Sequence, residues 1–240
     1  SLTTPEQQAI DTIKDIFSEE IDEYFQNETL SLKNKEEFSR MIEDILKEYK
    51  EDLKKIDWLS DQTKLNAIKK LDNMKINIGN TNKFEKLKYN LEKKNTLIDN
   101  VITILQKNKD NEIERLINNK KYNVLPQDTV NAYYNSSENS INFMSALTYL
   151  SQDSDDYYQK LGTIGMIVAH EITHAFDSTG SKFDEFGNLH NWWNKEDYLK
   201  YQKLQQKTIE YYNKYEVLEN RFIDGSKTVD ENIADLGAVN

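Results

Sequence analysis

Residues 162–177 read GTIGMIVAHEITHAFD, an apolar run that carries His170, Glu171 and His174. The run predicts an apolar α-helix, and residues four apart lie on one face of such a helix. Both imidazoles can therefore reach one metal ion, while Glu171, one position round the helix, faces a water beside that ion. At this histidine and glutamate content the pattern arises by chance in roughly 0.4% of such chains. Chance is therefore a poor explanation, and the pattern favours zinc hydrolysis.

Two imidazoles do not complete a catalytic zinc site, which has three protein ligands and one open position. One class of zinc peptidase places a glycine and a third histidine three and six residues after the second histidine, but Asp177 and Gly180 stand there. A cysteine ligand is excluded because the chain has no cysteine. The remaining class takes a carboxylate from a second helix. The candidate is Glu231, and the alternative is that Glu231 is an ordinary surface carboxylate.

Two further carboxylates have the spacing of partners for these histidines. Zinc-binding histidines usually donate their second ring N–H to a carboxylate, which fixes the tautomer. Asp235, four residues after Glu231 and on the same helical face, could accept from His170. Asp177 could accept from His174. The alternative for both is an ordinary helix cap or an exposed acid.

The third histidine of the chain, His190, lies in a polar turn, GNLHN at residues 187–191. A histidine in such a turn is more often exposed than part of a metal site. We predict that His190 lies outside the site.

The composition argues against several classes of partner. The 240 residues include 31 basic and 42 acidic side chains, a net charge of −11, which opposes binding to nucleic acids or to anionic membranes. No segment approaches the ~18–20 apolar residues of a membrane span. The absence of cysteine excludes disulfides, thiolate metal sites and a cysteine nucleophile. We therefore predict no nucleic-acid partner and no membrane segment in this chain.

Glycine and proline are scarce, at 7 and 2 residues, which favours long helices. Apolar periodicity and capping residues predict four helices before the middle of the chain. They cover residues 5–26 after Thr4, 35–56 after an Asn34 cap, 60–78 up to Gly79, and 86–121. We place a domain boundary between residues 80 and 81.

Two short strands are predicted at residues 130–135 and 140–143, and residues 136–139 join them into a hairpin. The acidic residues 153–156 are predicted to form a solvated loop. We therefore expect a mainly α (α+β) protein with a small antiparallel or mixed sheet beside the His170 helix.

Four ordered stretches carry a resemblance to a known family. They read NAYY at residues 131–134, HEITHAFD at 170–177, NWW at 191–193 and ENIADLG at 231–237. Together they resemble the neprilysin and endothelin-converting-enzyme family of zinc metallopeptidases, including its bacterial oligoendopeptidases. Residues 57–79 resemble the helical segment that precedes the catalytic region of that family, so the similarity spans residues 57–240.

The resemblance implies a zincin-like, thermolysin-like catalytic region with one Zn²⁺ per chain. The implied zinc ligands are His170, His174 and Glu231. Glu171 would be the general base, and Asp177 and Asp235 would orient the histidines, Asp235 being counted with Glu171 among the catalytic residues.

The resemblance also implies a peptide-binding surface. Asn131 and Ala132 match the edge strand that holds the substrate backbone in that family. Leu147, Met166 and Ile167 fall where the family lines an apolar pocket for the residue after the cut. The alternatives are a plain strand for the first two residues and core packing for the other three.

That family continues beyond the position of Asn240 with helices that supply a histidine and an arginine, and it has a large N-terminal lid. We therefore expect a fragment that can associate with the missing portions. Residues 1–80 would belong to the lid or linker, and residues 81–240 to a truncated catalytic domain. We expect a bacterial protein that is either cytoplasmic or secreted or located at the cell surface.

The expected function is a zinc-dependent endopeptidase that hydrolyses oligopeptides. Two alternatives stay open. The chain could be a catalytically weak or silent zinc-binding fragment with a structural or binding role, or a helical interaction module that holds no metal.

Overall fold

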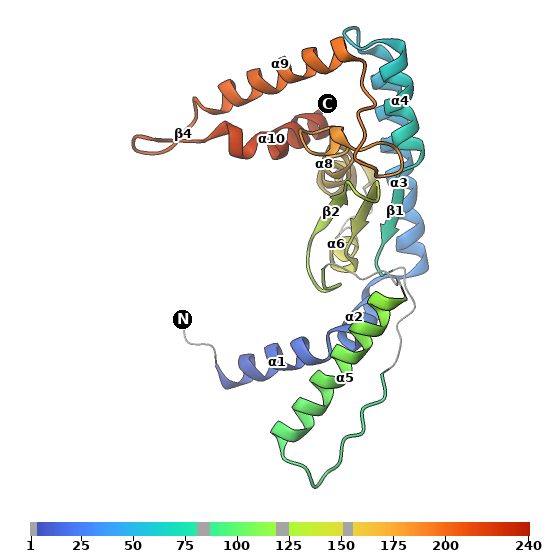
Figure 1. The fold of residues 1–240 in the computed structure, drawn as a ribbon, viewed down its shortest axis with the longest axis vertical. Helices are drawn as coiled ribbons and strands as arrows, with labels where there is room; N and C mark the ends of the chain where they lie inside the picture. The colour runs from blue at the N-terminus through green and yellow to red at the C-terminus, as the bar shows by residue number, and fades with distance from the viewer. Residues whose placement is uncertain (1–3, 81–86, 119–124, 151–155) are drawn as a thin grey trace.

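The computed structural model describes residues 4–80, 87–118, 125–150 and 156–240. The molecule has the shape of a C (Figure 1): α9 and α10 form the upper arm, α3 and α4 the back, and α1, α2 and α5 the lower arm. The mainly α (α+β) class is confirmed. Within these residues no helix is both long and apolar enough to span a bilayer.

The helices and strands of the described residues have the following bounds. The helices are α1 (Pro5–Ile16), α2 (Ser18–Thr29), α3 (Leu32–Lys55), α4 (Asp61–Asp72), α5 (Leu97–Ile117), α6 (Ser145–Leu150), α7 (Tyr157–Lys160), α8 (Met166–Thr173), α9 (Lys195–Tyr212) and α10 (Gly225–Val239), with a π-helical turn η2 (Leu161–Gly165) before α8 and a 3₁₀ turn η3 (Gly180–Lys182) after it. The strands are β1 (Lys75–Ile78), β2 (Ala132–Asn135), β3 (Ser140–Phe143), β4 (Glu216–Leu218) and β5 (Arg221–Phe222).

The main sheet has the strand order β1-β3-β2. The predicted hairpin is present, because β2 pairs antiparallel with β3 and Ala132 lies opposite Phe143. The prediction of a helix up to Gly79 is wrong for residues 75–78, which form β1 parallel to β3. Lys75 of β1 pairs with Ser140 of β3, which lies 65 residues later in the sequence. The sequence around residues 75–78 therefore does not indicate that they form a strand.

The prediction of one helix over residues 5–26 is also wrong. The chain breaks at Phe17 (φ −120°, ψ 36°), and two helices result. Asn108 of α5 donates its side-chain N–H to the carbonyl oxygen of Ile16 at 2.7 Å, which satisfies a group that a continuous helix would have paired internally. The ring of Phe17 packs edge-on against Tyr89.

Two helix starts differ from the predictions. Ser31, not Asn34, caps α3, and its hydroxyl accepts from the backbone N–H of Asn34 at 3.1 Å. The predicted helix over 86–121 is shorter, because residues 87–96 are irregular and Thr96 caps α5. Residues 86, 119–121 and most of the predicted acidic loop, 153–155, lie outside the described part of the chain.

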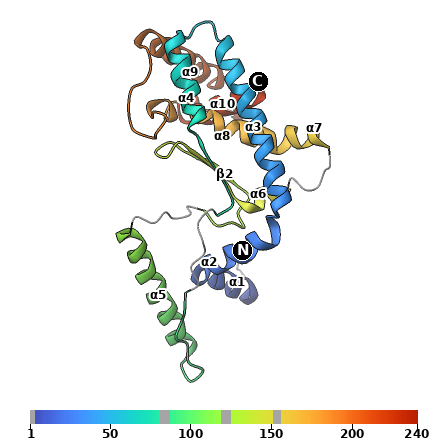
Figure 2. The ribbon, with the colours of Figure 1, turned by 90° about the vertical axis from the view of Figure 1, so that its right-hand side faces the viewer.

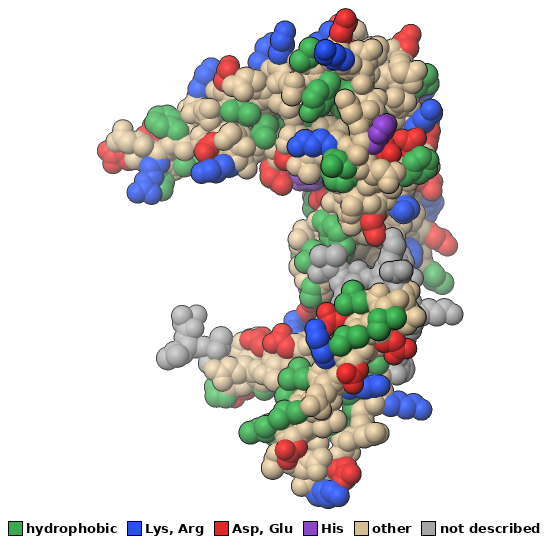
Figure 3. All heavy atoms as spheres, in the orientation of Figure 1, with side chains coloured by type: hydrophobic (Ala, Val, Ile, Leu, Met, Phe, Trp, Pro, Cys, Tyr) green, Lys and Arg blue, Asp and Glu red, His purple; other side chains and the backbone are tan. Residues whose placement is uncertain are grey.

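The core lies where α3 and α4 pack with the main sheet and α8 (Figure 2). Its fully buried side chains come from each of these elements: Ile42, Leu71, Ile141, Phe143, Val168 and Ile172. Residues on both sides of the predicted boundary at 80/81 therefore share one core, and the boundary stays a prediction. In the space-filling view, charged side chains of both signs are scattered over the visible face, which is hollowed between the two arms (Figure 3).

α10 crosses α8 at close range because Gly237 has no side chain. A Cβ added at Gly237 would overlap Thr173 of α8 and lie 2.7 Å from the hydroxyl oxygen of Tyr49 on α3. Tyr49 and Thr173 share a hydrogen bond at this point. The position therefore sets how closely α10 approaches α8.

Gly237→Ala should destabilise the protein by about 1–3 kcal/mol, because the overpacking outweighs the roughly 1 kcal/mol by which alanine favours a helix. Thermal unfolding measures the change. Gly162→Ala is the matched control, since a Cβ there meets no atom within 4 Å. A Gly237→Ala protein as stable as the Gly162→Ala protein would contradict this view of the contact.

A second prediction concerns Asp22 of α2, which is buried and accepts the backbone N–H of Gln127 at 2.8 Å. Burial raises the pKa of Asp22 to about 6, and the nearby negative charges of Asp128 and Glu19 act in the same direction. The folded protein thus holds this proton more tightly than the unfolded chain. The stability that Asp22 contributes is fully present below about pH 4 and is lost as the pH rises through 6.

Asp22→Asn removes this titration. The free energy of unfolding of the variant, relative to the native protein, should rise by about 2 kcal/mol between pH 4 and pH 7.5, as measured by urea unfolding at each pH. The exposed Asp57 provides the control substitution, Asp57→Asn. A difference between variant and native protein that does not change with pH would contradict the assignment.

Candidate metal centre

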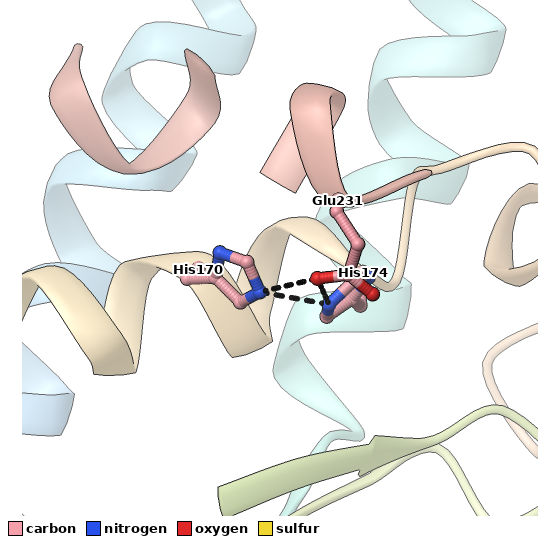
Figure 4. Close-up of side chains that lie close together, drawn as sticks. All are labelled: His170, His174 and Glu231. Carbon is pink, nitrogen blue, oxygen red and sulfur yellow. Dashed lines mark hydrogen bonds and ion pairs between the residues drawn. The ribbon is translucent and has the colours of Figure 1, made fainter. Parts of the chain in front are cut away.

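α8 and α10 together bring the histidines and the acidic residues to one place. His170 and Glu171 lie in α8, and His174 is its C-terminal cap. Glu231 and Asp235 lie in α10, which packs across α8. In the close-up, Glu231 reaches down from α10 to the two imidazoles, which both turn toward it (Figure 4).

The facing atoms of these three side chains have the spacing of a metal site. His170 Nε2 lies 3.0 Å from His174 Nε2 and 3.2 Å from Glu231 Oε2, and His174 Nε2 lies 3.7 Å from the same oxygen. Tetrahedral zinc with ligands at about 2.0–2.1 Å separates them by about 3.3 Å. The three side chains thus have the right spacing for one small cation.

The partners of the outer ring nitrogens make this arrangement suitable for a cation. His170 Nδ1 lies 2.9 Å from Asp235 Oδ1, and His174 Nδ1 lies 2.7 Å from Asp177 Oδ2. A neutral imidazole that donates from Nδ1 leaves Nε2 with a lone pair. Two such lone pairs and the Glu231 carboxylate oxygen would then converge and repel one another. A zinc ion between them would turn this repulsion into ligation, so the residues present fit the metal.

Asp177 lies in the segment of residues 175–183 that follows α8, and we call this segment the post-α8 loop. Its side chain is 6% exposed. One oxygen faces His174, while the other accepts the backbone N–H groups of Thr179 at 2.8 Å and Gly180 at 2.6 Å. Burial lowers the pKa of His174, but the hydrogen bond and charge of Asp177 outweigh this and the pKa is raised.

Glu171 lines the same cavity as the two histidines and Glu231. Its side chain is buried, and burial raises its pKa, while the charges of His174 and His170 and a hydrogen bond from the backbone of Tyr134 oppose the rise. The cavity of about 480 Å³ is lined by the histidines and Glu231 on one side and by β2 and Asn131 on the other. A carboxylate beside the candidate metal position therefore faces an edge strand.

Asn131 and Ala132 thus share the cavity with the candidate ligands. The backbone N–H of Ala132 bonds to the side-chain oxygen of Asn131 at 2.9 Å, so it points away from β3. Among the strands of the described residues, β2 pairs with β3 alone and forms an edge of the sheet. The strand can accept an extended chain along this edge.

The structure does not bring the other predicted pocket residues to this cavity. Leu147 is 2% exposed and lies in the core, and Ile167 packs against the core. Met166 is 40% exposed and lines a different groove, which α3 and the end of α10 complete. Their role in substrate selection stays a prediction. His190 is exposed and does not line the cavity.

Sequence reasoning missed Asp230, the residue before Glu231. Asp230 accepts the backbone N–H of Ser178 at 2.9 Å and the hydroxyl of Thr179 at 3.1 Å. It thereby ties the second turn of α10 to the post-α8 loop. The acidic pair Asp230-Glu231 was the available signal, but which acid faces which partner depends on how α10 packs.

Comparison with known proteins gives the family. Profiles of peptidase family M13 match residues 2–81 and residues 131–240. The neutral endopeptidase of Lactococcus lactis subsp. cremoris is 31% identical over 243 residues, covering 98% of this chain and 38% of the relative. An endothelin-converting enzyme homolog of Locusta migratoria is 31% identical over 211 residues, covering 83% of this chain and 29% of that protein.

Solved structures of similar proteins support the same family assignment. The zinc metalloprotease Zmp1 of Mycobacterium tuberculosis, in complex with an inhibitor, superposes with a TM-score of 0.86 at 25% identity, over 100% of this chain and 37% of that one. PepO of Lactobacillus rhamnosis superposes with a TM-score of 0.79 at 26% identity, over 94% and 36%. The zincin-like fold is thereby confirmed, and the chain spans three to four tenths of the length of these relatives.

The two profile matches belong to one family, lie in one chain and fall on a fold that superposes on zinc metalloproteases over its whole length; this chain belongs to peptidase family M13.

Proposed function

We propose that this chain holds one Zn²⁺ through His170, His174 and Glu231 and is the zinc-binding part of a metallopeptidase that hydrolyses oligopeptides. The observation that carries the proposal is the convergence of two imidazole Nε2 atoms and one carboxylate oxygen within 3.7 Å, with each Nδ1 held by its own carboxylate. The names of the relatives, neutral endopeptidase and zinc metalloproteinase, support the same reading.

When bound, zinc polarises a peptide carbonyl and lowers the pKa of a water molecule. Glu171 then acts as the general base. It takes a proton from the attacking water and delivers that proton to the nitrogen of the departing amine. Its position in the same cavity as His170, His174 and Glu231 supports this role.

Asp177 and Asp235 keep the two imidazoles in the tautomer that leaves Nε2 free. Asn131 and Ala132 hold the peptide backbone along the edge of β2, so that the substrate adds a strand to the sheet. In this binding mode the protein recognises the backbone of the peptide substrate rather than particular side chains. It suits flexible oligopeptides, which can become extended, better than folded proteins.

Two substitutions distinguish the proposed general base, Glu171, from the proposed zinc ligand, Glu231. Glu171→Gln should keep zinc but reduce cleavage of a fluorogenic peptide by at least about 10²-fold, because glutamine cannot take the proton. Glu231→Ala should lose zinc as well, because one of three protein ligands is gone. Zinc content by mass spectrometry and the cleavage rate with and without chelator measure both effects.

The exposed Glu219 supplies the matched control, Glu219→Gln, which should change neither quantity. Full activity of the Glu171→Gln protein would contradict the role of the base, and full zinc content of the Glu231→Ala protein would contradict the ligand. Zinc binding by the native chain without chelator-sensitive cleavage would favour a zinc-binding module with no activity of its own.

A further inference from the structure

Lys70 is buried beside the metal site, although none of the roles above involves it. It lies in α4 and its side chain is 1% exposed. Its Nζ donates to three backbone carbonyl oxygens, those of Ala175 at 2.8 Å, Gly180 at 2.7 Å and Phe183 at 2.7 Å. All three belong to the post-α8 loop.

The number of these bonds indicates that the amine is charged. An ammonium group has three N–H donors and a neutral amine has two, so the three carbonyl partners are satisfied only by the charged form. Burial lowers the pKa of Lys70 to about 7, while the negative charges of Asp177, Asp184 and Glu185 oppose this. The rings of Tyr134, Phe176 and Trp192 each lie with their centres 5.9 Å from Nζ.

The carbonyls that Lys70 binds flank the groups that orient His174. Ala175 directly follows His174 in the chain. Gly180 donates its N–H to Asp177 and offers its carbonyl oxygen to Lys70, so one residue links the ammonium to the carboxylate. Asp177 in turn accepts from His174. A continuous path of hydrogen bonds thus runs from Lys70 through the loop to a candidate zinc ligand.

We propose that Lys70 is a positioning residue for the metal site: its ammonium group clamps the post-α8 loop and thereby holds Asp177 against His174. The part of this proposal that concerns zinc affinity rests on the proposed function, whereas the clamp itself does not.

Neutral donors also bind this loop, which allows the contribution of the ammonium to be measured alone. The indole N–H groups of Trp192 and Trp193 donate to the carbonyl oxygens of Phe183 and Ser181, each at 2.9 Å. The hydroxyl of Tyr201 donates to the carbonyl oxygen of Phe176 at 2.5 Å. These bonds keep the loop attached to the fold when Lys70 is changed.

The experiment uses the absence of cysteine from the chain. In a Lys70→Cys protein, the single thiol is alkylated in urea with 2-bromoethylamine, and the protein is refolded. The product carries an ammonium group at the same number of bonds from the backbone as lysine. Alkylation with 1-bromopropane gives a neutral side chain of the same shape. Lys70→Met and the exposed Lys69→Met complete the set, the latter as control.

Two quantities are measured, the zinc dissociation constant by competition with a chromophoric chelator and the hydrogen exchange of the loop amides in metal-free protein. Lys70→Met and the propylated protein should bind zinc about 10-fold more weakly than the native protein, and the amides of Thr179 and Gly180 should exchange faster. The aminoethylated protein and Lys69→Met should resemble the native protein in both measurements.

Equal restoration by the propyl and the aminoethyl groups would overturn the proposal, because packing rather than charge would then explain Lys70. Native zinc affinity and native exchange in a folded Lys70→Met protein would overturn it as well. If the native chain itself binds no zinc, the proposed function fails, and the exchange rates alone decide whether the clamp exists.

Discussion

The contact between α8 and α10 is the constraint on which the candidate site depends. Two histidines on one helix provide two ligand atoms, and the third comes from Glu231, 57 residues after His174 in the sequence. The helices approach closely because Gly237 presents no side chain to Thr173 and Tyr49. Asp230, in the second turn of α10, bonds to the post-α8 loop. α10 is therefore held at two points, on either side of Asp235.

The two buried charged residues behind the candidate ligands, Asp177 and Lys70, each have hydrogen-bond partners. Asp177 is buried, but it accepts from His174 and from two backbone N–H groups. Lys70 is buried, but three carbonyl oxygens surround its amine. An uncompensated charge at either position would cost several kcal/mol, so each depends on the loop that lies between them. The post-α8 loop is thus held by α4, α10 and the end of α8, in addition to the neutral donors Trp192, Trp193 and Tyr201.

Much of the site could be predicted from the sequence because its spacing is local. His170, Glu171 and His174 are fixed by helical geometry, and Asp235 follows Glu231 by one turn. The hairpin β2–β3 is equally local. By contrast, β1 exists because β3 pairs with it from 65 residues away, and Asn108 interrupts the first helix from 92 residues away. Lys70 occupies a buried position of α4 between Ala67 and Leu71, and a lysine in such an apolar stripe was a signal that sequence reasoning passed over.

The central claim is that His170, His174 and Glu231 bind one zinc ion, and X-ray diffraction from crystals of the zinc-loaded chain tests it directly. An anomalous difference map calculated from data collected at the zinc absorption edge locates the metal without assumptions about its ligands. We predict one strong peak at about 2.0–2.2 Å from both Nε2 atoms and from an oxygen of Glu231. A peak bound by other side chains, or no peak between these three residues, would contradict it.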